Sequence, residues 1–197
     1  MTSDWQNLDW EPGEDEEAAE FSPAAGGAEA VFPRVQAVII RTLVSQLAER
    51  ISAEADDDPA DLDDLEAELG LSGSAEKPDD PVLARLLPDA YSDDPEASAE
   101  FRRYTEQSLR SGKLAAAQSV LSTLPAGGGK VRLNEEQCQD WLRALNDLRL
   151  ALGVILDITE ESDQQSQRLS ADDPRSVYMV VYHQLSYLQQ SLVLALE

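Results

Sequence analysis

Apolar residues recur at helical spacing over most of this chain, and no stretch alternates convincingly between apolar and polar positions. An apolar residue every three or four positions places one apolar stripe along a face of an α-helix. A short strand over 29–32 is the only departure that the pattern suggests. We therefore predict an all-α fold, a multi-helix bundle with mostly short loops. The stripes cover residues 35–51, 62–69, 82–87, 95–124, 138–156 and 177–192.

Six local signals mark where these helices begin. Proline disfavours the helical conformation in the residue before it, which is where an N-cap sits. An aspartate at that position accepts hydrogen bonds from unpaired amides, and proline suits the first helical position. Asn134 with Gln137 resembles a capping box, and Pro33 indicates one more start. The four Asp-Pro pairs are Asp58-Pro59, Asp80-Pro81, Asp94-Pro95 and Asp173-Pro174.

The first thirty residues differ from the rest in composition. Residues 14–17 are all acidic, and residues 22–27 are mostly Pro, Ala and Gly, so neither stretch buries enough surface to offset ordering entropy. We predict a disordered acidic tail over 1–30 and a single helical domain over 31–197. The tail either solubilises the chain, with its aromatics touching its own domain, or folds onto a partner. Its large apolar residues are Trp5, Leu8, Trp10 and Phe21.

The strong negative charge of the chain limits the classes of molecule that it can bind. The net charge is −24, and residues 1–100 hold 27 acidic against 5 basic residues, whereas residues 101–197 hold 12 against 10. Such a surface repels nucleic-acid phosphate and anionic lipid, because binding either needs Lys and Arg to displace counterions. The segment 95–113 is the one candidate DNA-recognition helix, and three glutamates share it. We therefore expect a protein partner and no direct nucleic-acid binding.

Targeting signals are not evident. No basic region precedes an apolar run at the start, so we expect no signal peptide. The apolar segment 176–196 contains one histidine and several glutamines, which argues against a membrane span of about 20 residues. With one cysteine the chain forms no internal disulfide. These features favour a cytoplasmic protein.

Cys138 and His183 are the only thiol and the only imidazole. Cys138 lies on an apolar stripe one turn before Trp141, which favours a buried core residue. The alternative is a redox thiol that works through sulfenic acid or through a bond to another molecule. His183 lacks a metal-binding companion at helical spacing, so a structural or surface role is expected.

No other motif points to catalysis, a cofactor or a metal. Residues 127–130 (Gly-Gly-Gly-Lys) lack the remaining features of a phosphate loop and are interpreted as a flexible connection between helices. The aspartates of 56–64 lack the spacing of a calcium loop and are interpreted as a solvated acidic helix. The enzyme alternative is a small-ligand pocket formed by Asn146, Asp147 and Arg149. We expect no enzyme, no cofactor and no metal site.

Basic residues gather on the helix over 95–124. Local pairs with Glu106 and Glu100 explain most of them. The sharper hypothesis is a contact surface for a partner or for the acidic tail, because arginine pairs with carboxylates while its stem packs. The exposed side of the next helix offers two further candidates. The candidate contact residues are Arg102, Arg103, Tyr104, Arg110 and Lys113, with Asn146 and Arg149.

Several runs are similar to one known family. They are residues 83–91, 94–96, 99–106, 131–137, 141–149 and 187–193, and the most specific is Asn-Asp-Leu-Arg at 146–149. The chain resembles, over roughly 31–197, the actinobacterial AosR-like family of oxidative-stress regulators, long catalogued as a domain of unknown function. The resemblance implies transcriptional regulation in redox stress through a sigma factor, without a conventional DNA-binding domain. A thiol–disulfide switch within one subunit needs two cysteines, and this chain has one.

We therefore expect a transcriptional regulator that contacts a protein partner, either a sigma factor or an RNA polymerase component, in the oxidative-stress response. The alternative is a non-catalytic, homo-oligomeric helical scaffold or adaptor without a role in transcription. In a homodimer, the stripes over 138–156 and 177–192 would pair across subunits.

Overall fold

The computed structural model describes residues 18–53, 76–158, 173 and 175–197 of the chain. Most of the described chain is helical, as predicted, and a helix covers each predicted stripe except that over 62–69. That stripe and the start at Asp58 lie outside the described residues. The helices are α1 (Arg34–Ala53), α3 (Pro81–Leu86), α4 (Pro95–Thr123), α5 (Glu135–Ile155) and α6 (Arg175–Ala195).

Side chains cap these helices where the sequence indicates. Asp80 accepts hydrogen bonds from two first-turn amides of α3 at 2.8 and 3.2 Å. Asp94 accepts one from α4 at 3.0 Å, and Asp173 accepts one at 2.9 Å from the amide that opens α6. Asn134 and Gln137 form a complete capping box at the start of α5. Each cap satisfies amides that have no partner within the helix, which fixes the boundary.

The all-α prediction is wrong in one respect, because the described chain contains a three-stranded antiparallel sheet. Its strands are β1 (Ser22–Ala24), β2 (Gly27–Phe32) and β3 (Gly129–Asn134), in the order β1-β2-β3. In β3, Val131 and Leu133 are buried while Lys130 and Arg132 are exposed, so a short period-two pattern is present. Residues 127–130 are therefore a turn that enters a strand, not a connection between helices.

The predicted disordered tail over 1–30 is too long. Residues 18–30 supply β1, most of β2 and four core side chains, those of Ala19, Phe21, Ala28 and Ala30. The Phe21 ring meets those of Phe32 and Trp141 edge-on, at 5.8 and 5.5 Å between centroids. Residues 1–17 lie outside the described part of the chain.

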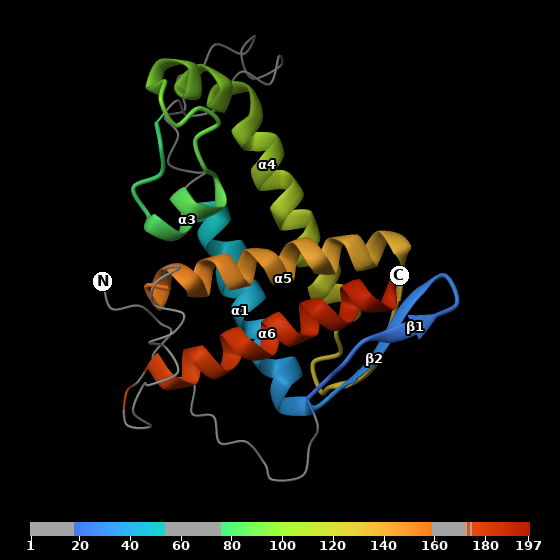
Figure 1. Ribbon diagram of the computed structural model, residues 1–197. Coiled ribbons are helices and arrows are strands. Elements are labelled where there is room, and N and C mark those ends of the chain that lie inside the picture. Colours follow the sequence, from blue (N-terminus) through green and yellow to red (C-terminus); the bar gives the residue numbers. More distant parts are fainter. Residues whose placement is uncertain (1–17, 54–75, 159–172, 174) are drawn as a thin grey trace.

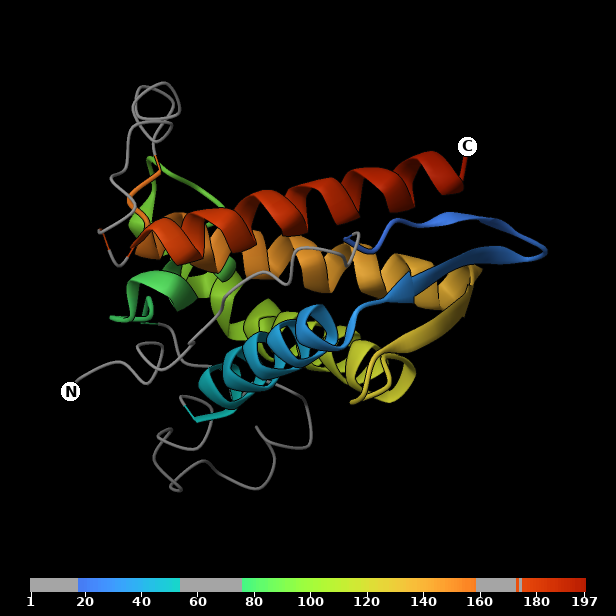
Figure 2. The same ribbon diagram turned by 90° about the horizontal axis from the view of Figure 1, so that it is seen from below.

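Helix α5 lies at the centre of the packing and contacts α3, α4 and α6. Helices α5 and α6 run side by side in opposite directions (Figures 1 and 2). Their apolar stripes face each other within one chain, so the prediction that these stripes pair across subunits is wrong. Trp141 is fully buried between α5 and the sheet, and its indole nitrogen donates to the Thr123 hydroxyl at 2.8 Å. No helix among the described residues has the length and apolar character needed to cross a bilayer.

Candidate interaction surface

The first half of α4 buries charged side chains and exposes aromatic ones. Arg102, Glu106 and Arg110 are only 5–8 % exposed, although each carries a formal charge. They are spaced four residues apart, so they share the face of α4 that turns toward the rest of the protein. We call these three residues the α4 charge cluster.

Glu106 lies at the centre of the α4 charge cluster. One carboxylate oxygen accepts from Arg102 at 2.7 Å, and the other accepts from Arg110 at 2.9 and 2.7 Å. Both pairs were predicted as local i,i+4 partners. Their burial was not predicted, and it matters because buried charges are tolerated only when they are paired and hydrogen-bonded.

The arginines of the cluster also fasten α4 to two other elements. Arg110 donates to the carbonyl of Ile51 at 2.9 Å, and Arg102 donates to the carbonyl of Leu87 at 3.2 Å. Both carbonyls belong to helix ends, of α1 and α3, where backbone acceptors lack intrahelical donors. Arg102 also binds the Asp89 carboxylate at 2.8 Å. The predicted partner role of Arg102 and Arg110 is therefore replaced by a role in holding α4 in place.

The electrostatics of the cluster agree with this role. Burial alone lowers the pKa of Arg102, but hydrogen bonds to Glu106 and Asp89 outweigh it, so the pKa is raised and the guanidinium stays charged. Hydrogen bonds from Lys77 and then Arg102 lower the pKa of Asp89. Both charged forms are thus favoured at neutral pH.

Lys113, another predicted contact residue, is used inside the fold as well. Its ammonium group binds the Asp147 carboxylate at 2.7 Å, which joins α4 to α5. Asp147 is 6 % exposed, and its burial raises the pKa of the carboxyl while the hydrogen bond from Lys113 lowers it, with burial prevailing.

Arg149 turns to the opposite side of α5, toward α6. It donates to the Ser186 hydroxyl at 2.9 Å and to the Gln189 amide oxygen at 2.6 Å, and its guanidinium lies 5.5 Å from the Tyr182 ring centroid. Asp147 and Arg149 therefore face different helices and do not form the small-ligand pocket of the enzyme alternative. Asn146 between them is half-buried.

The exposed side of α4 carries the two remaining candidates, Arg103 and Tyr104. Tyr104 is 59 % exposed, and Phe101 and Leu109 are exposed at nearby positions of the same helix. Tyr91 packs edge-on against Phe101, 6.2 Å between centroids. We call these five residues the α4 surface. The first half of α4, which carries four of them, lies at the end of the molecule opposite the sheet (Figure 1).

The loop that carries Tyr91 is held in place by Ser98 on the first turn of α4. The Ser98 hydroxyl donates to the Tyr91 carbonyl at 2.7 Å and accepts from the Tyr91 amide at 3.0 Å. Both backbone groups of Tyr91 are satisfied, so the α4 surface is built on fixed backbone. Exposed aromatic side chains on a fixed backbone are typical of protein contact sites, since little entropy is lost on binding.

The two candidate reactive residues lie in different environments, Cys138 in the core and His183 on the surface. Cys138 is fully buried in the core, and desolvation raises the pKa of its thiol from 9.0. Redox-sensing cysteines are instead exposed and have lowered pKa values, so the structure argues against the redox-thiol alternative. His183 is exposed on α6.

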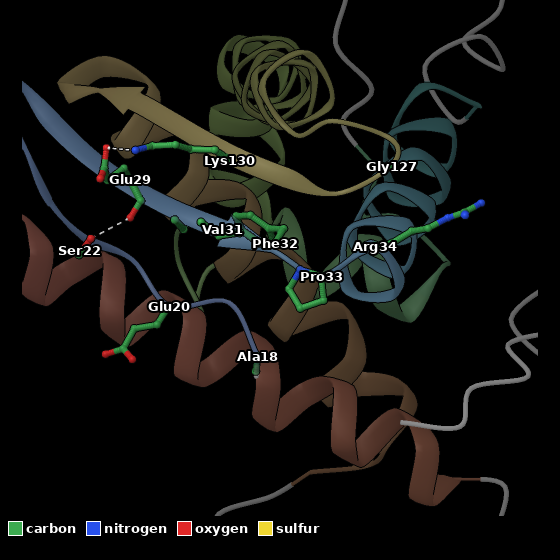
Figure 3. Close-up of a pocket in the computed structure, with 11 residues that line it drawn as sticks. Ala18, Glu20, Ser22, Glu29, Val31, Phe32, Pro33, Arg34, Gly127 and Lys130 are labelled. Atoms are coloured by element: carbon green, nitrogen blue, oxygen red, sulfur yellow. Dashed lines mark hydrogen bonds and ion pairs between the residues drawn. The ribbon is translucent and has the colours of Figure 1, made fainter. Parts of the chain in front are cut away.

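A hollow of about 710 Å³ lies where β2 meets α1 (Figure 3). Glu29 and Lys130 point toward each other on its wall, with 3.0 Å between carboxylate and ammonium. Hydrogen bonds from Lys130 and Arg132 lower the pKa of Glu29, which does not suit it to general acid catalysis near neutral pH. Among the described residues, no group of three His, Cys, Asp or Glu side chains could hold a metal ion.

Comparison with known proteins shows the family to which the chain belongs. Residues 18–196 match the family described as Domain of unknown function (DUF2017). The chain belongs to the DUF2017 family. The match begins at residue 18, the first residue that the structure describes. It therefore includes β1 and β2, most of which the sequence analysis had assigned to a disordered tail.

Curated relatives of this DUF2017 chain carry a functional name. The chain is 39% identical over 154 residues to the oxidative stress regulator AosR of Mycobacterium tuberculosis (strain H37Rv) and to that of Mycobacterium bovis. Each of these alignments covers 71% of this chain and 69% of the relative. A Mycobacterium leprae protein that carries the AosR name is 38% identical over 175 residues, 82% of this chain and 78% of the relative. The predicted family resemblance is confirmed. No solved structure matches the chain.

Sequence reasoning selected the first half of α4 but did not separate its buried face from its exposed face. It favoured the arginines as contact residues, and it passed over Phe101 and Leu109. One signal in the sequence indicated the buried face. Arg102, Glu106 and Arg110 are spaced four residues apart, and the same helix face carries apolar residues in the second half of α4. A stripe that becomes apolar further along the same helix face is the buried face.

Proposed function

We propose that this DUF2017 protein regulates transcription in the oxidative-stress response by docking a protein partner on the α4 surface. The partner is a sigma factor or an RNA polymerase component. Relatives named oxidative stress regulator support the regulatory role, and the exposed aromatic residues of α4 support contact with a protein. We propose in addition that the protein has no catalytic activity.

The chemistry around the α4 surface indicates what kind of segment binds there. Four exposed carboxylates, those of Asp93, Asp94, Glu96 and Glu100, lie on the preceding loop and the first turns of α4. Arg103 is the exposed cation beside them. An aromatic patch with an acidic border suits a partner segment that combines apolar side chains with Lys or Arg, because opposite charges steer encounter and fix orientation.

The same observations count against a nucleic-acid ligand. Net charge is −24, and the buried or half-buried cations Arg102, Arg110, Lys113 and Arg149 already bind groups of the protein itself. Cations engaged in this way are not available to displace counterions from phosphate.

A binding measurement with purified components tests the proposal. Full-length chain is immobilised, and each sigma factor and the RNA polymerase core of the source organism are passed over it in turn. One or more is expected to bind, and Tyr104→Ala is expected to weaken that binding at least tenfold. Truncation of a central aromatic anchor in an interface costs about 2 kcal/mol or more, and 1.4 kcal/mol is a factor of ten.

The matched control is Tyr187→Ala, which removes a comparably exposed tyrosine from α6 (49 % against 59 % for Tyr104). It is expected to leave the affinity within a factor of two. Absence of binding to any sigma factor or polymerase component, or equal effects of the two tyrosine substitutions, would refute the proposal. A second readout is induction of oxidative-stress transcripts in cells that carry Tyr104→Ala in place of the natural chain.

A further inference from the structure

Helix α6 carries a row of exposed apolar side chains along one face. Val180, Tyr187 and Leu194 are 38, 49 and 54 % exposed, and they recur every seven residues. His183 and Gln190, both exposed, lie between them at the intervening three- and four-residue steps. This is the spacing of the contact seam in a helical pair. We call these five residues the α6 seam.

The α6 seam is also free of charge. Residues 176–196 contain no Asp, Glu, Lys or Arg, in a chain with 54 such residues among 197 and a net charge of −24. A protein that needed only to stay soluble would gain by placing some of its many carboxylates on this exposed helix. Two copies of so acidic a protein repel one another, and an uncharged helix is where that repulsion is least.

We propose that two copies of this chain associate through the α6 seam, with the two α6 helices packed antiparallel about a two-fold axis at Tyr187. Tyr187 lies midway between Val180 and Leu194. A two-fold axis at Tyr187 therefore sets each Val180 against Leu194 of the other copy, and each Tyr187 against its own counterpart. Such a contact is self-complementary, as an isologous dimer requires.

The antiparallel direction follows from the ends of the helix. It sets the N-terminal end of each α6 beside the C-terminal end of the other, so the two helix dipoles attract. The parallel arrangement also pairs the seam with itself, but it sets like ends of the dipoles together. The two directions make opposite predictions for charge substitutions, which the test exploits.

The seam is small, so the dimer is expected to be reversible. From Val180 to Leu194 the helix rises about 21 Å, at 1.5 Å per residue. A contact of one helix pair of this length buries less than the 1,200–2,000 Å² of total area that is common in stable complexes. We expect dissociation at micromolar concentration, not at nanomolar.

Sedimentation equilibrium of the full chain over a micromolar concentration series is the primary test. The natural chain is expected to show a monomer–dimer equilibrium. Val180→Glu combined with Leu194→Glu is expected to raise the dissociation constant at least tenfold, because four carboxylates then meet in the seam. Val180→Lys combined with Leu194→Glu is expected to restore association, because each lysine then faces a glutamate of the other copy.

Val38→Glu is the matched control, since Val38 is 45 % exposed on α1 and lies outside the seam. It is expected to leave the dissociation constant unchanged. Circular dichroism of all variants checks that each keeps its helix content. The variant Tyr104→Ala is expected to dimerise normally, which separates this proposal from the one for the α4 surface.

Cross-linking locates the axis. In a Cys138→Ala background, Tyr187→Cys places the only thiol of each copy at the proposed two-fold axis. A short bismaleimide is expected to join two such copies rapidly, and Val38→Cys in the same background is expected to react without dimer formation. A monomeric natural chain, equal loss of dimer in the Lys/Glu and Glu/Glu variants, or equal cross-linking at positions 38 and 187 would overturn the proposal. Binding of the seam to a membrane or to a different protein instead of a second copy would appear as the first of these outcomes.

Discussion

The substitution Glu106→Gln tests whether the α4 charge cluster holds the fold together. Gln has nearly the volume of Glu, so the packing changes little and the change is mainly the loss of one buried negative charge. In the natural protein Glu106 accepts hydrogen bonds from two buried arginines at 2.7–2.9 Å. The amide of Gln removes the negative charge that the two guanidiniums share, and its NH₂ group adds a donor where only donors face it.

The expected cost is about 3 kcal/mol. Removing one partner of a buried ion pair costs roughly 3–5 kcal/mol because the remaining charge is uncompensated. The lower end applies here because Arg102 keeps its bond to Asp89, and both arginines keep bonds to backbone carbonyls. With a urea m-value of about 2.5 kcal/mol/M, the loss moves the unfolding midpoint down by about 1.2 M.

Urea unfolding followed by circular dichroism measures this shift. The control Glu100→Gln changes an exposed carboxylate on the same helix and is expected to alter stability by less than about 0.5 kcal/mol. In a double-mutant cycle with Arg110→Met, the two losses are expected to be non-additive by about 1 kcal/mol or more. A loss below about 1 kcal/mol for Glu106→Gln, or additive losses in the cycle, would show that the cluster is not a structural clamp.

Three further measurements address other elements. Cys138 is expected to react with Ellman's reagent only on unfolding, because burial raises the pKa of its thiol; fast reaction of the native protein would contradict this. Gly128→Ala is expected to destabilise by 2 kcal/mol or more, since Gly128 has φ of +74° and an added Cβ would lie 2.6 Å from a backbone oxygen, whereas Gly127→Ala, with open space around it, is expected to be near neutral. Lys113→Met is expected to raise the Asp147 pKa further in a carboxyl-carbon NMR titration, because Lys113 is the group that lowers it; an unchanged pKa would contradict the ion pair.

The Asp147 result also fixes the sign of a stability effect. Burial raises the folded-state pKa of Asp147 above the ordinary value of 3.8, so between these two pKa values the folded protein binds more protons than the unfolded chain. The contribution of Asp147 to stability is therefore full below pH 3.8 and is lost as pH rises through its folded-state pKa. At neutral pH this carboxylate opposes folding, and the ion pair with Lys113 offsets part of that cost.

Helix positions were predictable because short-range signals set them. Asp80, Asp94 and the Asn134–Gln137 pair cap helices by contacts within three residues, and such contacts are visible in the sequence. Helix α4 is continuous through Gly112. A single glycine costs about 1 kcal/mol in a helix, which the packing of the flanking turns overcomes.

The sheet was not predictable by the same means. Strands β2 and β3 are about one hundred residues apart in the chain, and the partner of a strand is what stabilises it. Strand β2 (Gly-Ala-Glu-Ala-Val-Phe) is rich in small residues, and its only local strand signal is the suggested strand over 29–32, which the structure confirms. Phe21 was assigned to the disordered tail for the same reason. Its contacts are with Phe32 and Trp141, which are distant in the sequence and come close only in the folded chain.

The α4 surface and the α6 seam together predict a stoichiometry. Helix α5 lies between α4 and α6, so pairing through α6 leaves the α4 surface of each copy open (Figures 1 and 2). If both proposals hold, a dimer binds two partner molecules. Sedimentation velocity of the complex with its sigma factor or polymerase component is therefore expected to give a 2:2 assembly, and the Val180→Glu, Leu194→Glu chain is expected to give 1:1 at unchanged affinity per site. A dimer that binds only one partner molecule would contradict this arrangement, in which each copy keeps its α4 surface open.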